Sequence, residues 1–240
     1  LSITQVFGEN RRIKAVLDIV VPTLNEEANI DQLVTRLKNA CPEARLIFVD
    51  NCSTDRTLEI LEGYGVDIVR HTVNEGYGKS LYDGIIAGTA DYIVTIDADL
   101  EYPPECITQL IARLDQCSVV YGSRFAGDTD PAMGAFRIYG NQLISWIFNK
   151  LYGQAVSDLY TGVKAFRRSA LDGLEFQCSG FVFVVEFAAK LVRSGFRLEE
   201  EPVEYTIRRA GRRKMKHVAE ASKALSLLLF YRVSRLKIKS

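Results

Sequence analysis

Three acidic residues at alternate positions follow one apolar run of this 240-residue sequence. The run, residues 93–96, leads directly into Asp97, Asp99 and Glu101. Alternate side chains of an extended chain point to the same side, so the carboxylates of Asp97 and Asp99 would lie about 6–7 Å apart. Oxygen ligands at this spacing suit Mg²⁺ or Mn²⁺, and Glu101 could supply a third ligand. A solvated acidic turn after a strand is the alternative interpretation.

The apolar run belongs to a regular alternation of strand-like and helix-like segments. Nearly continuous apolar segments predict strands, and each is followed by a segment with helical spacing of its apolar residues, except the last. Strands are predicted at residues 16–21, 45–50, 66–71, 92–97 and 118–124, and helices at 25–40, 55–61, 78–87 and 104–114. The alternation predicts an α/β fold, Rossmann-like, with a mostly parallel central sheet and helices on both faces.

The pattern is weaker beyond residue 125. Residues 125–136 are rich in Gly, Asp and Pro and predict a mobile loop. Helices are expected at 139–151 and 180–194, and one or two short strands at 197–207. We expect residues 125–136 and 208–216 to close over a bound ligand, because both contain glycine and the second concentrates positive charge.

Polar residues also follow the first three predicted strands. The carboxyl ends of parallel strands meet at one edge of a sheet, where α/β proteins bind their ligands. Each cluster alone is more typical of a helix cap. These three clusters and the acidic motif after the fourth strand together predict a crevice for a nucleotide and a metal ion. The clusters contain Asn25, Glu26 and Glu27 after the first strand, Asp50, Asn51, Ser53 and Asp55 after the second, and Lys79, which could reach a phosphate, after the third.

These motifs, in this order, resemble the family 2 glycosyltransferases of the GT-A fold. The resemblance is carried by VVPTLNEE (20–27), VDNCSTDRT (49–57), NEGYGKS (74–80), the acidic Asp97–Asp99 motif and YGSRF (121–125). Three later segments are similar to the polyprenyl- or dolichyl-phosphate sugar transferases, and above all to the mannosyltransferases: SDLYTGVKAFRR (157–168), GFVFVVEFAAKLVRSGF (180–196) and EPVEYTIRRAGRRKMK (201–216). The resemblance implies metal-dependent, inverting transfer of a sugar from a nucleotide sugar to a polyprenyl phosphate.

The resemblance also implies roles for the matching positions. The nucleoside would be contacted by Pro22, Leu24, Asn25, Glu26, Val49, Asp50 and Asn51. The metal ion or the donor would be contacted by Lys79, Asp97, Ala98, Asp99, Glu101 and Arg124. Arg208 and Lys214 match a basic pair that closes over the diphosphate. Arg124 and Arg137 are our candidates for positioning an acceptor phosphate. Glu186 matches an acid of the family and is a catalytic candidate, with a structural pairing to an arginine as the alternative.

Two positions depart from the family pattern. Asp50-Asn51-Cys52-Ser53 stands where Asp-Asp-Gly-Ser is usual, and Leu24 stands where the mannosyltransferases commonly have tyrosine. Both positions lie where the base and ribose should bind. The resemblance therefore leaves the donor open between a GDP-linked and a UDP-linked sugar.

The C-terminal end is strongly basic, although the formal net charge of the chain is zero. Residues 208–240 contain eleven Lys or Arg and one acid; subtraction from the totals of 30 and 30 leaves nineteen bases and twenty-nine acids in residues 1–207. The segment 223–237 is apolar in its middle and flanked by bases, which is typical of a helix in the headgroup region of a membrane. We expect a GT-A domain over residues 1–215 and an interfacial helix over 216–240, attached peripherally to the cytoplasmic face of a membrane. A packed C-terminal helix is the alternative.

Other features limit the classes of function. No run reaches the roughly 20 apolar residues that span a bilayer, and no secretory signal is visible. Five cysteines without metal-binding spacing indicate reduced thiols and a reducing compartment. The basic segment lacks interleaved aromatic residues, so nucleic acid is not an expected partner. Transfer to a sugar hydroxyl, nucleotidyl transfer and a catalytically silent membrane-binding module are the competing functions.

Overall fold

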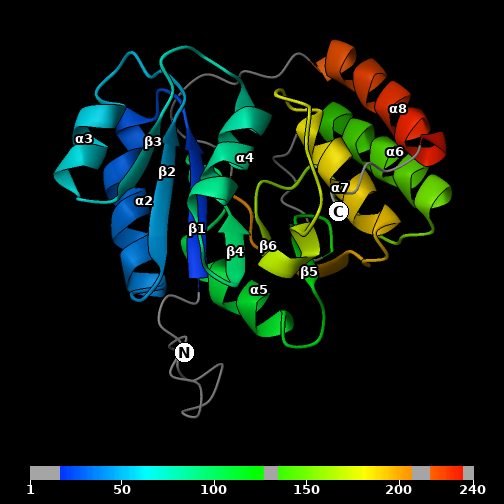
Figure 1. The fold of residues 1–240 in the computed structure, drawn as a ribbon, viewed down its shortest axis with the longest axis horizontal. Helices are drawn as coiled ribbons and strands as arrows, with labels where there is room; N and C mark the ends of the chain where they lie inside the picture. Colours follow the sequence, from blue (N-terminus) through cyan, green and yellow to red (C-terminus); the bar gives the residue numbers. More distant parts are fainter. Residues whose placement is uncertain (1–16, 127–134, 207–216, 235–240) are drawn as a thin grey trace.

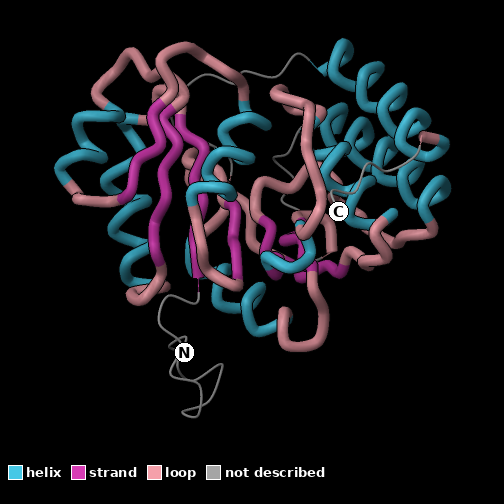
Figure 2. The backbone as a smooth tube through the Cα atoms, viewed as in Figure 1, coloured by secondary structure: helices cyan, strands magenta, loops and turns pink. Residues whose placement is uncertain are grey.

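The computed structural model describes residues 17–126, 135–206 and 217–234. The strands of these segments form one seven-stranded sheet in the order β3-β2-β1-β4-β6-β5-β7, and helices surround it (Figures 1 and 2). The strands are β1 (Leu17–Thr23), β2 (Arg45–Asp50), β3 (Asp67–Arg70), β4 (Tyr92–Thr95), β5 (Val119–Ser123), β6 (Lys164–Arg167) and β7 (Glu199–Pro202). Only β6 runs antiparallel to its two neighbours among these strands. The predicted mostly parallel sheet is therefore confirmed.

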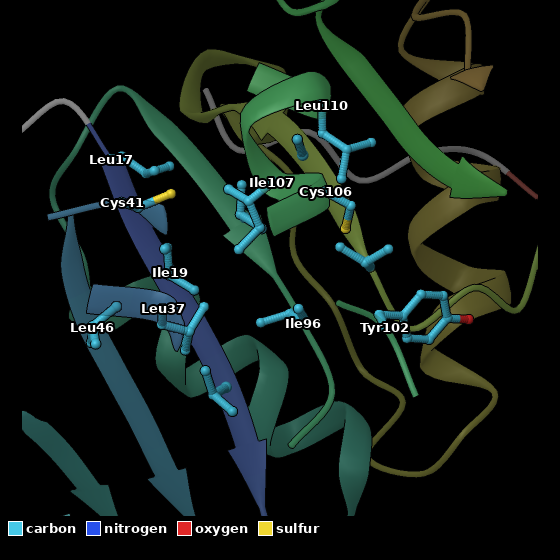
Figure 3. Close-up of a cluster of buried hydrophobic side chains, with 14 of the residues drawn as sticks. Leu17, Ile19, Leu37, Cys41, Leu46, Ile96, Tyr102, Cys106, Ile107 and Leu110 are labelled. Atoms are coloured by element: carbon cyan, nitrogen blue, oxygen red, sulfur yellow. The ribbon is translucent and has the colours of Figure 1, made fainter. Parts of the chain in front are cut away.

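Helices cover both faces of the sheet, as predicted. The first apolar core lies between the sheet and α2 (Glu27–Ala40), α3 (Thr57–Gly63) and α5 (Ile107–Arg113), which is preceded by a 3₁₀ turn, η1 (Pro104–Cys106); part of this core is drawn in Figure 3. The second core lies between the sheet and α4 (Tyr77–Ala87), α6 (Ala135–Tyr152), α7 (Phe183–Arg193) and α8 (His217–Val233). A further 3₁₀ turn, η2 (Arg168–Leu171), follows β6.

The central strand β1 shows why the sequence folds in this way. All seven of its residues are buried, because helices cover it on both sides. Its successive side chains enter different cores: Ile19 lies in the first and Val20 in the second. A strand that is covered twice needs an apolar residue at nearly every position, which is the pattern of residues 16–21.

Register brings the ends of four strands to one edge of the sheet. Thr23 of β1 pairs with Asp50 of β2, and Asp50 pairs with Arg70 of β3. Val20 of β1 pairs with Thr95 of β4, so the acidic motif lies close to the same level. This carboxyl edge, at the top of the sheet in Figure 1, carries the polar clusters that the sequence predicts there.

Two details of the sequence prediction were wrong, and the choice left open between one and two strands at 197–207 is resolved to one over the described part of that region. β4 ends at Thr95, so Asp97 and Asp99 lie on a turn beyond the strand rather than in extended backbone. The turn includes Leu100 at a φ of +60°. The antiparallel strand β6 was not predicted, and the region 197–207 supplies only one strand, β7, within the described residues.

The C-terminal helix α8 packs on α6 and α7 (Figure 1). Its residues Ala224, Leu228 and Tyr231 are buried, whereas Leu229 and Phe230 are more than half exposed, at 51% and 56%. Leu228 therefore contributes to the protein core and is not available for burial in a membrane. In the described parts of the chain, no helix combines the length and the apolarity needed to cross a bilayer.

Candidate active site

The loops that follow β1 and β2 are joined by hydrogen bonds. The side-chain oxygen of Asn25 accepts a hydrogen bond from the Thr54 amide at 2.7 Å, and the Asn25 amide donates to Ser53 Oγ at 3.0 Å. The Glu27 amide donates to Asp55 Oδ2 at 3.2 Å. Asn25 has a φ of +51°, which asparagine tolerates better than most residues. The two loops thus form one connected platform at the predicted nucleoside site.

Asn51 connects this platform to the loop after β3. Its Oδ1 accepts the Glu75 amide at 2.8 Å and faces His71 Nδ1 at 3.0 Å, while its Nδ2 donates to Asn74 Oδ1 at 2.9 Å. An amide side chain supplies both an acceptor and a donor here, which an ionised aspartate could not do. The departure from the family pattern at this position therefore serves contacts within the protein.

The neighbouring departure, Cys52, adopts a left-handed backbone conformation with a φ of +66°. This is the position at which the family usually has glycine, the residue that adopts this conformation without steric cost. The local backbone thus retains the glycine-like turn although a side chain is present. Cys52 Sγ contacts the Thr72 carbonyl oxygen at 3.5 Å, in the loop after β3.

Lys79 lies in the first turns of α4 and remains partly accessible. Its Nζ contacts Asp83 Oδ2 at 2.6 Å, and the same carboxylate lies 3.0 Å from His71 Nε2. The Lys79 side chain is 39% exposed, so the ion pair leaves it able to turn toward a ligand. The phosphate contact of Lys79 stays a prediction.

Asp97 lies between α4 and the loop before β6. Its Oδ1 accepts a hydrogen bond from Tyr77 Oη at 2.7 Å. Its Oδ2 lies against Gly162, where the carbon of any larger side chain would collide with it. Burial raises the pKa of Asp97 to about 6, although the Tyr77 hydrogen bond and the charges of Lys164 and Arg124 act to lower it. A divalent cation bound beside this carboxylate would lower its pKa further.

Lys164 of β6 is a buried amine whose charge acts on Asp97. Its Nζ donates to the Thr161 carbonyl oxygen and lies 5.2 Å from the centre of the Tyr121 ring. Burial lowers the pKa of Lys164 to about 8, against the effect of the Asp97 charge, which raises it. Sequence reasoning did not single out Lys164. The signal in the sequence was the lysine inside the apolar segment GVKAF. A lysine is rarely buried unless it has a partner.

Asp99 and Glu101 do not join Asp97 in a three-carboxylate cluster. Asp99 Oδ1 accepts the Glu101 amide at 3.1 Å, whereas Glu101 is buried and its Oε2 accepts Tyr205 Oη at 2.7 Å. Among the residues that the structure describes, no group of three or more His, Cys, Asp or Glu side chains could hold a metal ion. The prediction of Glu101 as a third ligand is not supported. Mg²⁺ and Mn²⁺ commonly bind one or two carboxylates and complete their shell with substrate phosphates, so a site made by Asp97 and Asp99 alone stays a prediction.

Arg124 is held in the interior rather than presented to a phosphate. Its Nε and Nη2 donate to the two oxygens of Asp158, at 2.6 and 2.8 Å. The pair is almost completely buried, and the rings of Tyr102 and Tyr205 lie within 6 Å of the guanidinium. Asp158 thus engages Nε and Nη2 of the guanidinium, and the predicted contact of Arg124 with the metal ion or the donor stays a prediction. The charge of Arg124 acts on Asp97 through space.

Glu186 is fully buried in α7 and is surrounded by donors from the protein itself. Its Oε1 accepts Lys190 Nζ and Tyr231 Oη, both at 2.6 Å. Its carboxylate also accepts the amides of Gln177 and Cys178, at 3.0 and 2.8 Å. Burial acts to raise the pKa of Glu186, but these hydrogen bonds outweigh it and hold the pKa below its usual range. Glu186 therefore has partners within the protein, a lysine and a tyrosine instead of the expected arginine, and its catalytic role stays a prediction.

The remaining predicted residues lie as follows. Pro22 and Val49 are in β1 and β2, Leu24 follows β1, and Ala98 is buried between the two aspartates. Glu26 is buried and its Oε2 accepts Asn29 Nδ2 at 2.8 Å; Asp50 is buried and its Oδ1 accepts the Ser53 amide at 3.3 Å. Arg208 and Lys214 lie outside the described residues, as do 208–216 as a whole and 127–134 of the predicted covering loop.

Comparison of the sequence with known proteins identifies the family of this chain. Residues 18–174, more than half of the chain, match the model of the family described as Glycosyl transferase family 2. The chain belongs to this family. The resemblance drawn from the motifs is thereby confirmed, and the loops after β1, β2, β3 and β4 all lie within the matched region.

Two named relatives show how far the similarity extends. The low-salt glycan biosynthesis hexosyltransferase Agl6 of Haloferax volcanii is 31% identical over 200 residues, with 80% of this chain and 48% of that protein covered. A dolichol-phosphate mannosyltransferase of Pyrococcus furiosus is 28% identical over 221 residues, with 83% of this chain and 59% of that protein covered. The chain thus spans about half to three fifths of the length of these relatives.

A solved structure shows the same fold. Glucosyl-3-phosphoglycerate synthase of Mycobacterium tuberculosis, in complex with Mn²⁺, UDP and glucosyl-3-phosphoglycerate, superposes with a TM-score of 0.69 at 20% identity, with 94% of this chain and 81% of that chain covered. The predicted GT-A type of α/β fold is therefore confirmed.

Proposed function

We propose that this family 2 chain transfers a sugar from a GDP- or UDP-linked donor to a polyprenyl phosphate, with Mg²⁺ or Mn²⁺ as cofactor. The observation that carries the proposal is the position of Asp97 and Asp99. They follow β4 at the edge of the sheet where the loops after β1, β2 and β3 form a connected polar platform. The crevice at such an edge is where open α/β sheets bind nucleotides.

In this proposal, each residue around Asp97 has a separate role in the reaction. A bound divalent ion would neutralise the charge that develops on the departing diphosphate. Asp97 and Asp99 would hold this ion, and Tyr77 fixes the orientation of the Asp97 carboxylate through its 2.7 Å hydrogen bond. Lys79, which is 39% exposed at the start of α4, is placed to contact the diphosphate. The buried charges of Lys164 and Arg124 keep the pKa of Asp97 lower than burial alone would set it.

The structure favours an acceptor that is already ionised. Transfer to a sugar hydroxyl requires a general base within reach of the proton, and Glu186 is the predicted catalytic carboxylate outside the acidic motif. That carboxylate is buried and accepts hydrogen bonds from two side chains and two backbone amides. A polyprenyl phosphate needs no such base, and the relative from Pyrococcus furiosus is named for a dolichol-phosphate acceptor. Nucleotidyl transfer, the third candidate, has no support from membership of family 2.

Membrane attachment through α8 completes the proposal. An acceptor with a long isoprenoid tail stays in the bilayer, because each CH₂ group exposed to water costs about 0.8 kcal/mol. Exposed apolar side chains lie on α8 and on the neighbouring α6, and residues 208–240 carry eleven basic residues that an anionic surface attracts. The exposed apolar residues are Tyr139, Leu143 and Trp146 of α6 and Leu225, Leu229, Phe230 and Val233 of α8. We propose peripheral attachment at the cytoplasmic face.

Product analysis tests the proposed function. The full chain is incubated with Mn²⁺, a polyprenyl phosphate in detergent and, separately, GDP- and UDP-linked hexoses. The proposal expects a lipid-linked sugar and one nucleoside diphosphate per turnover with at least one donor. Release of pyrophosphate would indicate nucleotidyl transfer instead. Sugar transfer to free glycosides but not to the lipid phosphate would show that the acceptor is a hydroxyl group.

A further inference from the structure

A continuous series of contacts connects α8 to Asp97. It begins at Tyr231, whose Oη donates to Glu186 Oε1 at 2.6 Å. Glu186 in turn accepts the backbone amides of Gln177 at 3.0 Å and Cys178 at 2.8 Å. One buried carboxylate therefore fixes both the C-terminal helix and the start of the segment 177–181, which precedes α7.

The segment 177–181 packs directly on the first turn of α4. The Ser179 carbonyl oxygen accepts the Lys79 amide at 3.1 Å. A Cβ atom at Gly76 would lie 2.6 Å from that same oxygen, and one at Gly78 would lie 2.7 Å from the Gly180 carbonyl oxygen. The two glycines of NEGYGKS are therefore required by this close backbone approach, whatever else the loop binds.

The series ends at the candidate metal ligand. The ring of Phe181 stacks on the ring of Tyr77, with centroids 5.0 Å apart and planes at 15°. Tyr77 Oη then donates to Asp97 Oδ1 at 2.7 Å. The position of the phenol, and with it the direction of the hydrogen bond to Asp97, depends on where Phe181 is held.

We propose that Glu186 is a positioning residue for Asp97, acting through the segment 177–181 and the Phe181–Tyr77 stack, and that Tyr231 makes this positioning depend on the packing of α8. The inference rests on the proposed function and adds a residue role to it. Glu186 touches neither substrate nor metal in this account. The helix proposed to meet the membrane is thereby connected to the site that binds the metal–nucleotide complex.

The test compares Tyr231, a residue of α8, with Tyr152, a residue of α6 that contacts α8. Tyr231→Phe removes the hydrogen bond to Glu186 and leaves the ring in place. Tyr152→Phe is the matched control, because Tyr152 Oη donates to the Leu228 carbonyl oxygen of α8 at 2.8 Å and, among the described residues, makes no hydrogen bond to the segment 177–181. Both variants lose one hydrogen bond to or from α8, so a general loosening of that helix would affect both alike.

Two readouts are taken on the full chain without acceptor. Titration of Mn²⁺ in the presence of GDP or UDP, followed by the electron paramagnetic resonance signal of free Mn²⁺, gives the dissociation constant of the ion. Hydrogen exchange gives the protection of the Gln177 and Cys178 amides. Tyr77→Phe, which removes the direct partner of Asp97, should weaken Mn²⁺ binding about tenfold. Tyr231→Phe should weaken it about threefold and speed exchange at both amides, while Tyr152→Phe should change neither.

The outcomes separate this inference from the proposed function. Wild-type affinity and unchanged exchange in Tyr231→Phe would overturn the inference and leave the proposed function intact. Equal losses in Tyr231→Phe and Tyr152→Phe would also overturn it, since the effect would then come from general loosening of α8. A wild-type chain that binds no Mn²⁺ with either nucleotide would overturn both. Glu186→Gln, which retains an acceptor oxygen but loses the charge, should fall between wild type and Tyr77→Phe.

Discussion

Tyr77 donates a 2.7 Å hydrogen bond to Asp97, a residue twenty positions later in the sequence. The contact exists because the first turn of α4 and the turn after β4 lie at the same edge of the sheet. It leaves Asp97 with one oxygen directed by a phenol and the other against Gly162. The orientation of the candidate metal ligand is therefore determined by three separate elements of the fold.

Asp97→Asn should abolish transfer and at the same time stabilise the fold at alkaline pH. The pKa of Asp97 is about 6 in the folded chain and 3.8 in the reference state, so the folded state binds more protons between these values. The free energy of unfolding of the wild type therefore falls as the pH rises through this window, by at most about 3 kcal/mol. Asparagine does not titrate, so the variant avoids this loss. Thermal melts of both proteins from pH 4 to pH 8 measure the difference. A variant that is less stable than wild type at pH 8 would contradict the role given to burial.

Gly162→Ala should disrupt the site more than the fold. A Cβ atom at this position would collide with Asp97 Oδ2 and approach the Tyr102 ring to 2.8 Å, so the carboxylate must move. A displacement of about 1 Å can lower a rate about a hundredfold. The control is Gly63→Ala at the end of α3, where nothing lies within 4 Å of the added atom. Steady-state rates of the two variants test the prediction, and equal rates would refute it.

Arg124→Ala should unfold the chain more readily, because it leaves the buried Asp158 carboxylate without its cation. Removing one partner of a buried pair costs about 3–5 kcal/mol. Arg56→Ala is the comparison, since the Arg56–Glu59 pair has side chains 70% and 67% exposed and such pairs contribute about 0–1 kcal/mol. Urea denaturation of both variants measures the costs. If Arg124→Ala kept wild-type stability but lost activity, Arg124 would be a direct ligand after all.

Charge placed on the exposed face of α8 should weaken membrane binding without affecting the fold. Leu229→Glu and Phe230→Glu alter side chains that are 51% and 56% exposed. Ile86→Glu is the control, because Ile86 is 62% exposed near the end of α4, which begins at the carboxyl edge of the sheet. Co-sedimentation with anionic vesicles should fall for the α8 variants only, and wild-type binding should weaken with salt. Equal binding by all three variants would mean that α8 is only a packed helix.

Much of the fold could be predicted from the sequence because doubly covered strands leave a clear pattern. β1, β2, β4 and β5 lie within one or two residues of their predicted bounds, and the largest differences are the ends of β1 and β4, each shifted by two residues. The antiparallel β6 was missed because it has only four residues, Lys164–Arg167, and a charged residue at each end. So short a segment shows no alternation of apolar and polar residues. Its place between β4 and β5 depends on pairing with strands far away in sequence.

The site was harder to predict where a side chain could serve either a ligand or the protein. Asp97 and Asp99 follow a buried strand, and position in the sheet identifies them. Arg124 and Glu186 match family motifs equally well, but Arg124 is paired with Asp158, 34 residues away, and Glu186 with Tyr231, 45 residues away, and only the folded chain shows these contacts. Tyr77 and Lys164 went unnoticed because neither a tyrosine in a glycine-rich loop nor a lysine in a strand indicates an aspartate as neighbour.

The metal requirement of the transfer reaction tests the central claim most directly. The rate of lipid-linked sugar formation is measured for wild type with Mn²⁺, for wild type with excess EDTA, and for Asp99→Ala with Mn²⁺, each with circular dichroism to confirm the fold. The account predicts transfer in the first case, and no transfer with a retained fold in the other two. Full activity in EDTA, or in Asp99→Ala, would contradict the assignment of Asp97 and Asp99 to a catalytic metal ion.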